Sequence, residues 1–228
     1  MKLRMKVAIG AALVLIAGAA AAGWWLPRAY ADGEADFQTA ADAKRINDVH
    51  KIAELVEAYR DKTGRLPFDG PGASGLDDPF TVLVGAPKAE RELASRGNPL
   101  GQEPPTATSA DLLRVLRSEL GAHVTLPVDP QRGETGAPNA YYVRFKPGGE
   151  YMVAGFLRRP NAIAAPIAPG VSAYAVRSEQ GAWGGPIWAH ARAVSQVSEA
   201  ERLRIAQHGQ WADEQFARYM DTSTGSGN

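Results

Sequence analysis

The stretch from Asp36 to Pro67 constrains the fold of this chain most strongly, because it has the pattern of a long amphipathic helix. Apolar residues recur in it at steps of three and four, which places them on one helix face. Gly64 predicts the end of the helix, since glycine adopts the terminating left-handed conformation without a Cβ clash, and Pro67 prevents the helix from resuming. The apolar stripe consists of Ile46, Val49, Ile52, Ala53, Val56 and Tyr59, and the charged positions expected to stay in solvent are Lys44, Arg45, Asp48, Lys51, Glu54 and Glu57.

An uncharged run precedes this helix, from Val7 to Leu26. Its length matches the roughly 20 apolar residues that cross a bilayer as a helix. Lys2, Arg4 and Lys6 precede the run and only Arg28 follows it closely, which favours a cytoplasmic N-terminus. The sequence therefore predicts a single-pass inner-membrane protein with its remaining residues in the periplasm.

A cleaved signal peptide is the alternative interpretation of the same segment. Ala29 and Ala31 form an acceptable small-x-small cleavage site before Asp32, which would release the chain into the periplasm. The apolar run is longer than the roughly 7–15 residues of a usual signal core, which favours retention as an anchor. Both interpretations carry the following residues across the membrane.

Domain organisation and charge follow from this division. Residues 1–31 form the anchor or signal, residues 32–221 one periplasmic domain, and residues 222–228 a small polar tail expected to be disordered. The chain has no cysteine, which excludes disulfides, thiolate metal sites and a cysteine nucleophile. Four of its 25 basic residues and none of its 25 acidic residues precede residue 32, so the remainder is net acidic. Nucleic-acid binding has little electrostatic support in such a domain.

The rest of the chain predicts an α+β fold, in which the long N-terminal helix packs on a small antiparallel sheet and a C-terminal helix follows. Aromatic and β-branched residues indicate strands, and proline, glycine and capping residues indicate the helix ends. The helix stripe is expected to face Tyr151, Val153 or Phe156. The expected elements are a strand at Phe80–Val84, a helix from Pro87 to Ser95, a helix from the N-cap Ser109 to Leu120 with Gly121 as terminator, a hairpin of Tyr141–Phe145 and Glu150–Leu157, a linker or edge wrap at Arg159–Gly170, a strand at Ala173–Arg177, a short element at Trp183–Ala189, and a helix from Ser198 with the stripe Ile205, His208, Ala212, Phe216 and Tyr219.

Several short motifs together resemble type II secretion pseudopilins and type IV pilin-like proteins. The helix ends in a Tyr-Arg-x-x-x-Gly-x-x-Pro phrase that begins at Tyr59, and Leu126–Pro130 resembles the Pro-x-Asp-Pro loop of that family. The resemblance implies a helical spine carrying an antiparallel sheet, and a non-catalytic role in a secretion or pilus-like assembly. It implies as partners the inner membrane, other envelope or secretion-system proteins, and further copies of the chain.

Two features of that family are absent from this sequence, so the resemblance is to an atypical pilin-like protein. The Gly-Phe-Thr-Leu-x-Glu processing motif does not occur at the start of the apolar run near Val7. The acidic calcium loop is also unmatched after Gly155, where the chain continues with Phe156 to Pro160. Calcium is therefore not among the implied ligands.

The sequence contains no convincing enzyme motif. It predicts a protein with no catalytic, cofactor-binding or metal-binding residue and no cofactor. No pair of histidines has the spacing of a zinc motif, and His50 and His208 are expected to pack within helix stripes. The segment Gly72–Gly75 lacks the strand context of a nucleophile elbow, and the pair Asp77 and Asp78 lacks further oxygen ligands for a cation. The four histidines are His50, His123, His190 and His208.

The segment from Trp183 to Trp188 supports an alternative function. Two tryptophans around a Gly-Gly-Pro turn can present an aromatic surface to a glycan or a peptide. The alternative is therefore a periplasmic glycan- or peptide-binding module carried by the anchor or released by signal cleavage. A purely structural role, with both tryptophans covering the end of the sheet, is the competing interpretation of this segment.

Overall fold

The computed structural model describes residues 39–69, 80–85, 107–130, 139–146, 149–159, 161, 163–179 and 186–224. The chain divides into two compact units, Met1–Thr39 and Ala40–Asn228, and the elements that follow belong to the second. Within the described residues no helix is long and apolar enough to cross a membrane. The run from Val7 to Leu26 and the helix predicted from Pro87 to Ser95 both lie outside them.

The long helix predicted from the apolar stripe is present over residues 39–63. Val49, Ile52 and Val56 are completely buried in the core that the helix shares with the sheet. Gly64 ends the helix with a φ of 74°, and its N–H donates to the carbonyl of Arg60 at 2.7 Å. Only glycine adopts such a conformation readily, so the predicted end of the helix is confirmed for a physical reason.

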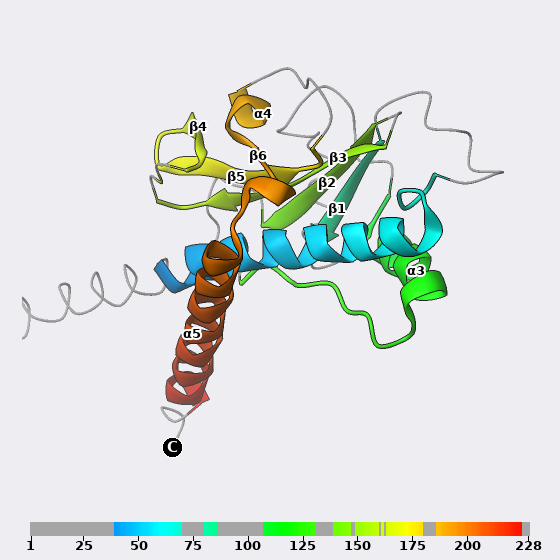
Figure 1. Cartoon of the computed structure of the whole chain (residues 1–228). Coiled ribbons are helices and arrows are strands. Elements are labelled where there is room, and N and C mark those ends of the chain that lie inside the picture. Colours follow the sequence, from blue (N-terminus) through cyan, green and yellow to red (C-terminus); the bar gives the residue numbers. More distant parts are fainter. Residues whose placement is uncertain are drawn as a thin grey trace, which may run out of the picture. The chain divides into compact units, whose positions relative to one another are not determined.

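A six-stranded sheet lies against this helix (Figure 1). Neighbouring strands run antiparallel in the order β1-β2-β3-β5-β4, and β6 adds a short parallel pairing to β5. The predicted antiparallel hairpin is confirmed as β2 and β3, and the segment predicted as a linker or edge wrap contains the edge strand β4. The strands are β1 (Phe80–Gly85), β2 (Ala140–Lys146), β3 (Glu150–Leu157), β4 (Ala165–Ala168), β5 (Val171–Arg177) and β6 (Arg192–Ala193).

The central strand β3 is buried on both faces, and alternate residues belong to two different cores. Tyr151 and Val153 face the long helix, as predicted. Phe156 belongs instead to the core on the opposite face, where it meets the ring of Tyr142 edge-on. Of the three residues predicted as alternatives, Phe156 is therefore the one that does not face the helix, because the period of two in a strand sends residues 153 and 156 to opposite sides.

The long helix approaches the sheet closely at Gly155 of β3. A Cβ atom at this position would lie 3.1 Å from Cγ2 of Val49 and 3.1 Å from the ring of Tyr141. Such distances are tighter than ordinary van der Waals contact, so a larger residue would require the side chain of Val49 or Tyr141 to move by a few tenths of an ångström. Gly155 thereby permits the close packing of Val49 and Tyr141 at this point.

Helix α3 (Ser109–Leu120) follows the predicted range, but its N-cap is one residue earlier than predicted. Thr108, rather than Ser109, forms a capping box with Asp111. Asp111 can reach back to the threonine backbone because it stands three residues inside the helix. Gly121 ends the helix with a φ of 107°, as its position in the sequence predicted.

The C-terminal region contains the short helix α4 (Pro186–His190), a 3₁₀ turn (Val194–Gln196) and the helix α5 (Glu199–Thr224). The hydroxyl of Ser198 accepts from the N–H of Glu201 at 3.3 Å, which confirms the predicted start of α5. Because α5 continues to Thr224, its last residues occupy the first part of the segment predicted as a tail.

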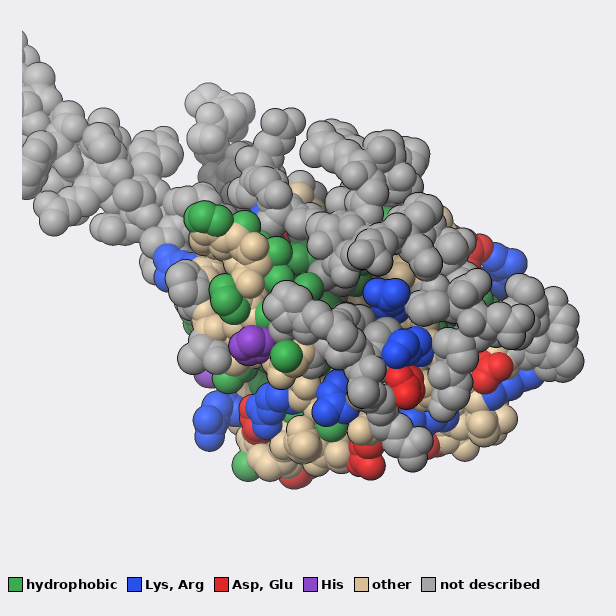
Figure 2. Space-filling model, turned by 90° about the horizontal axis from the view of Figure 1, so that it is seen from above, with side chains coloured by type: hydrophobic (Ala, Val, Ile, Leu, Met, Phe, Trp, Pro, Cys, Tyr) green, Lys and Arg blue, Asp and Glu red, His purple; other side chains and the backbone are tan. Residues whose placement is uncertain are grey.

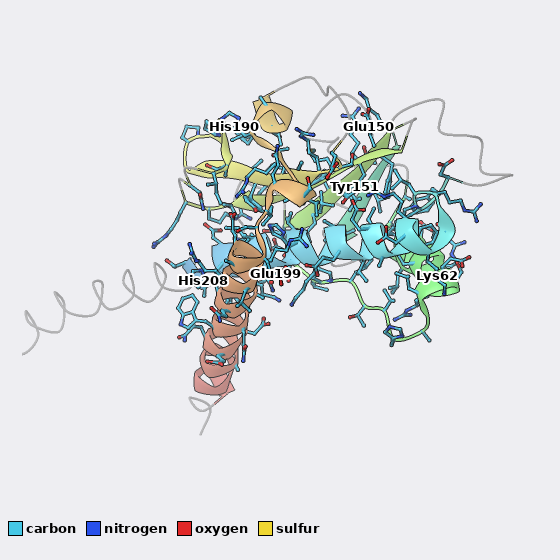
Figure 3. All side chains as sticks on the ribbon, viewed as in Figure 1. Lys62, Glu150, Tyr151, His190, Glu199 and His208 are labelled. Atoms are coloured by element: carbon cyan, nitrogen blue, oxygen red, sulfur yellow. The ribbon has the colours of Figure 1, made fainter. Side chains whose placement is uncertain are left out.

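Helix α5 meets the long helix at Gly209, which the predicted stripe did not include. Within that stripe Ala212 is completely buried and Ile205 and Phe216 are half-buried, so the prediction holds in part. Figure 3 shows α5 beside the start of the long helix. A Cβ atom at Gly209 would overlap the side chain of Asn47, so the two helices meet at a position where only glycine fits. His208, predicted to pack in the stripe, is exposed. The apolar pattern did not indicate Gly209, because glycine contributes nothing to such a pattern although it permits a close approach.

Candidate functional site

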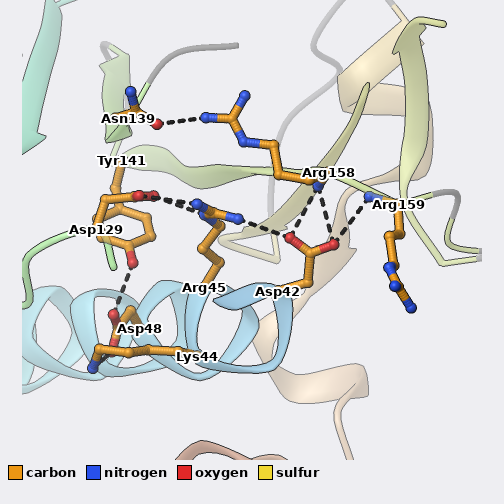
Figure 4. A network of polar contacts seen from close by, with 9 residues as sticks. All are labelled: Asp42, Lys44, Arg45, Asp48, Asp129, Asn139, Tyr141, Arg158 and Arg159. Carbon is orange, nitrogen blue, oxygen red and sulfur yellow. Dashed lines mark hydrogen bonds and ion pairs between the residues drawn. The ribbon is translucent and has the colours of Figure 1, made fainter. Parts of the chain in front are cut away.

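The described residues that differ most from a plain hydrophobic core are charged side chains buried near the start of the long helix (Figure 4). The guanidinium of Arg45 donates to both carboxylate oxygens of Asp129, from Nε at 2.9 Å and from Nη2 at 3.1 Å. Its Nη1 donates to Asp42 at 2.9 Å. The side chains of Arg45 and Asp129 are only 3% and 2% exposed, so this is a buried ion pair with a second carboxylate beside it.

Asp42 connects the same arginine to the end of β3. Its two carboxylate oxygens accept from the backbone N–H of Arg158, at 2.9 and 3.0 Å, and from that of Arg159 at 3.0 Å. The Arg158 guanidinium turns away from Asp42 and donates to the side chain of Asn139 (Figure 4). Through these contacts the first turns of the helix hold the point where the chain leaves the sheet.

A second group of charges lies one turn further along the helix. The buried carboxylate of Asp48 accepts from the hydroxyl of Tyr141 at 2.7 Å and forms an ion pair with Lys44 at 3.4 Å. Lys44 also pairs with Asp213 of α5 at 3.0 Å. This second group therefore joins the long helix to β2 on one side and to α5 on the other.

The electrostatics of this network follow from its burial. Burial raises the pKa of Asp42 and of Asp48, because removal from water disfavours the carboxylate more than the neighbouring cations and donors favour it. Burial alone would lower the pKa of Arg45, but the hydrogen bonds and charges of Asp129 and Asp42 outweigh it and raise that pKa. Burial, with the charge of Arg45, lowers the pKa of Arg158 to about 10, which leaves it protonated at neutral pH.

The prediction of a fully solvated charged face was wrong at Arg45 and Asp48, which are both buried. A signal for Arg45 was present: it stands four residues before Val49 and seven before Ile52, which places it on the apolar stripe itself. Asp129 gave a weaker signal, as a single carboxylate between two prolines. Its partner is 84 positions away in the chain, and no local pattern reports such a contact.

The arrangement is suited to holding segments together. In the first cluster Arg45 donates to both Asp42 and Asp129, and all three side chains are buried. Asp48 has no exposed surface and is already bound to Tyr141 and Lys44. A substrate would have to displace these contacts to reach the carboxylates or the guanidinium, so the geometry fits a brace between the helix, the sheet and α5.

His50 is buried, as its place beside the apolar stripe predicted, and its Nε2 lies 2.7 Å from the hydroxyl of Tyr174. Burial is the largest cause that lowers the pKa of His50 to about 4; the positive charges of Arg202 and Arg192 also lower it, and Glu201 opposes them. The ring is therefore neutral at neutral pH. Burial likewise raises the pKa of Tyr174, to about 12.

The remaining candidates from the sequence do not gather into a site within the described residues. His123, His190 and His208 are each exposed, and no three His, Asp or Glu side chains in the described part of the chain could hold a metal ion together. Figure 3 places His190 in α4 and His208 in α5, on separate elements. The candidates that lie outside the residues described by the structure are Gly72–Gly75, Asp77, Asp78, Trp183 and the side chain of Trp188.

No protein-family model, no curated protein and no solved structure matches the chain. The resemblance to pseudopilins and pilin-like proteins stays a prediction from the sequence motifs.

Proposed function

We propose that this chain is a single-pass inner-membrane protein whose periplasmic domain acts by assembly with other envelope proteins, as a component or accessory of a type II secretion or type IV pilus-like system. The observation that carries the proposal is the long helix. An uncharged 20-residue run from Val7 to Leu26 precedes it in the sequence, and Val49, Ile52 and Val56 pack it across the antiparallel sheet. The buried charges around Arg45 support the same role, because they fix the helix rigidly to the domain.

The face of the long helix that the sheet leaves uncovered is the surface proposed to meet a partner. Lys51, Glu54 and Asp61 are exposed on it and carry charges of both signs. A mixed row of charges on a rigid helix favours a partner with complementary charges over a purely apolar one. At the end of this face, Lys62 is fixed against α3 by a hydrogen bond to the carbonyl of Glu119.

The topology is tested by reporter fusions placed after Asp36. A periplasm-dependent reporter should be active there and a cytoplasm-dependent reporter inactive. Cytoplasmic activity at this position would contradict the proposal. Migration of the mature protein separates the two forms of export, because cleavage after Ala31 removes the first 31 residues.

The partner is tested by photo-crosslinking in intact cells. A photoreactive residue replaces Glu54 on the exposed helix face, and the control replaces Ser118, which is exposed on α3. We expect products with an envelope or secretion protein from position 54 and none from position 118. Equal labelling of unrelated proteins from both positions, together with normal protein secretion after gene deletion, would refute the assembly role.

A further inference from the structure

The segment of residues 163–171, termed here the apolar hairpin, exposes an unusual surface. It contains β4 and the turn into β5, and no charged residue occurs between Pro160 and Val176. Ile163 and Ile167 are 41% and 37% exposed, and residues 166–170 between and beyond them are all exposed. Edge strands in soluble surroundings usually carry charges that prevent association, so an uncharged apolar edge indicates a surface that something covers.

The apolar hairpin lies at the end of the domain where the long helix begins. Leu157, the last residue of β3, pairs with Ser172 next to the hairpin turn. The following residue, Arg158, donates its backbone N–H to Asp42 in the first turns of the helix. Figure 1 shows β4 and the start of the helix at the same side of the domain, and Figure 2 shows hydrophobic side chains gathered at that side.

The length of the preceding chain ties this end of the domain to the bilayer. Twelve residues separate Leu26, the end of the predicted membrane run, from Thr39. They span about 40 Å when fully extended and about 18 Å as a helix. The end of the domain near residue 40 is therefore held within that distance of the lipid surface, whichever conformation the connecting residues adopt.

We propose that the apolar hairpin docks on the phospholipid surface of the membrane that anchors the chain, with Ile163 and Ile167 inserted at the boundary between headgroups and acyl chains. The proposal rests on the proposed single-pass topology. Apolar side chains enter this boundary by about 5–10 Å when a protein lies on a bilayer. Arg159 supplies a cation beside the hairpin: its side chain is exposed and points away from Asp42 (Figure 4), which suits an anionic headgroup.

The geometry of the hairpin favours lipid over a second copy of the chain. Pairing between two β4 edges needs a regular row of backbone donors and acceptors. Pro166 has no N–H, and the pairing register of β4 shifts between Pro166 and Ala168. Lipid needs no such row. Asn161 stabilises the turn before β4, because its side-chain oxygen accepts from the N–H of Ile163 at 3.0 Å and its carbonyl accepts from that of Ala164 at 3.1 Å.

Because the natural chain lacks cysteine, single-cysteine variants of the full chain test the docking directly. The full chain is reconstituted into vesicles of phosphatidylethanolamine and phosphatidylglycerol and labelled with a polarity-sensitive fluorophore at Ile167→Cys. The matched control carries the label at Asp61→Cys, which is exposed near the other end of the long helix. We expect a blue shift at position 167 and loss of fluorescence when nitroxide lipids are included, with neither change at position 61.

Further variants separate the possible outcomes. Ile163→Asp should abolish the blue shift at position 167, and Arg159→Gln should reduce it in anionic vesicles only. If the chain resists alkaline extraction but the label at 167 behaves like that at 61, docking is refuted and the topology stands. If the chain is extracted, the proposed topology itself fails. Spontaneous disulfide formation between two copies at position 167, without lipid quenching, would assign the surface to a second copy and overturn the proposal.

Discussion

Replacing Arg45 by methionine tests whether the buried charges hold the long helix in place. Arg45→Met keeps most of the aliphatic length but removes the charge and every hydrogen-bond donor of the guanidinium. It leaves the carboxylates of Asp129 and Asp42 buried without the cation that they share. The two carboxylates repel each other. Bulk water cannot replace the lost guanidinium at Asp129, because the side chain of Asp129 is only 2% exposed.

The expected loss in the free energy of unfolding is about 3–5 kcal/mol, the usual cost of removing one partner from a buried ion pair. A domain of this size has about 5–15 kcal/mol in total. The double variant Arg45→Met/Asp129→Leu should recover much of the loss, because it removes the uncompensated carboxylate together with its partner. A smaller loss in the double variant than in the single variant would thus report the buried charge itself.

Arg114→Met provides a matched control. Arg114 also pairs with an aspartate three residues before it, Asp111, but its side chain is 76% exposed. Its loss should cost less than about 1 kcal/mol, since solvent screens exposed pairs. Urea unfolding of residues 32–228, followed by circular dichroism, measures all three variants. Equal midpoints for Arg45→Met and Arg114→Met would refute the argument that burial makes the first pair structurally important.

Three further predictions follow from the described contacts. His50 has a folded-state pKa near 4, below its unfolded value of 6.5, so the free energy of unfolding should fall by about 2–4 kcal/mol as the pH falls between these values. Urea titrations of His50→Gln should not show this dependence on pH. Val56→Asp should cost about 3–5 kcal/mol in the same unfolding assay, because it places a carboxylate in the core. Glu54→Ala, at an exposed position, should cost under about 0.5 kcal/mol. Equal unfolding midpoints for the two variants would contradict the packing of the long helix on the sheet. Purified protein should contain no stoichiometric transition metal, and elemental analysis that finds one zinc per chain would overturn this.

The pH prediction has opposing contributions from the carboxylates, and their sign differs from that of His50. The folded-state pKa values of Asp42 and Asp48 are raised above the unfolded value, so the folded state takes up protons first as pH falls. Their contribution to stability is present below the unfolded pKa and lost as pH rises through the folded pKa. A comparison of His50→Gln with the natural chain isolates the histidine, because both proteins retain the two aspartates.

Elements governed by neighbours in the sequence were predictable. The strands at residues 80–84 and 150–157 and the helix from 109 to 120 each have local apolar periodicity, and Gly64 and Gly121 each carry the positive φ expected of a helix terminator. The N-cap of α3 was misplaced by one residue because threonine and serine stand side by side at 108 and 109, and both cap well.

The buried network was not predictable in the same way. The distant partners of Asp42, Asp48 and Asp129 are Arg158, Tyr141 and Arg45, which lie 84 to 116 positions away in the chain. A charged residue beside an apolar stripe is usually solvated, and the assignment to solvent follows that tendency. Only the fold shows that the loop carrying Asp129 and the end of β3 close over this part of the helix.

The placement of Asp42 and Arg45 one turn apart also has a mechanical consequence. A pull applied to the chain at Ala40 reaches two attachments almost at once: Asp42 to the backbone after β3, and Arg45 to Asp129. Both attachments then carry the load at the same time, whereas attachments loaded one after another would break in succession. A domain held from one end, and pulled by whatever it binds, would resist detachment of its helix at the first turns, where the force enters.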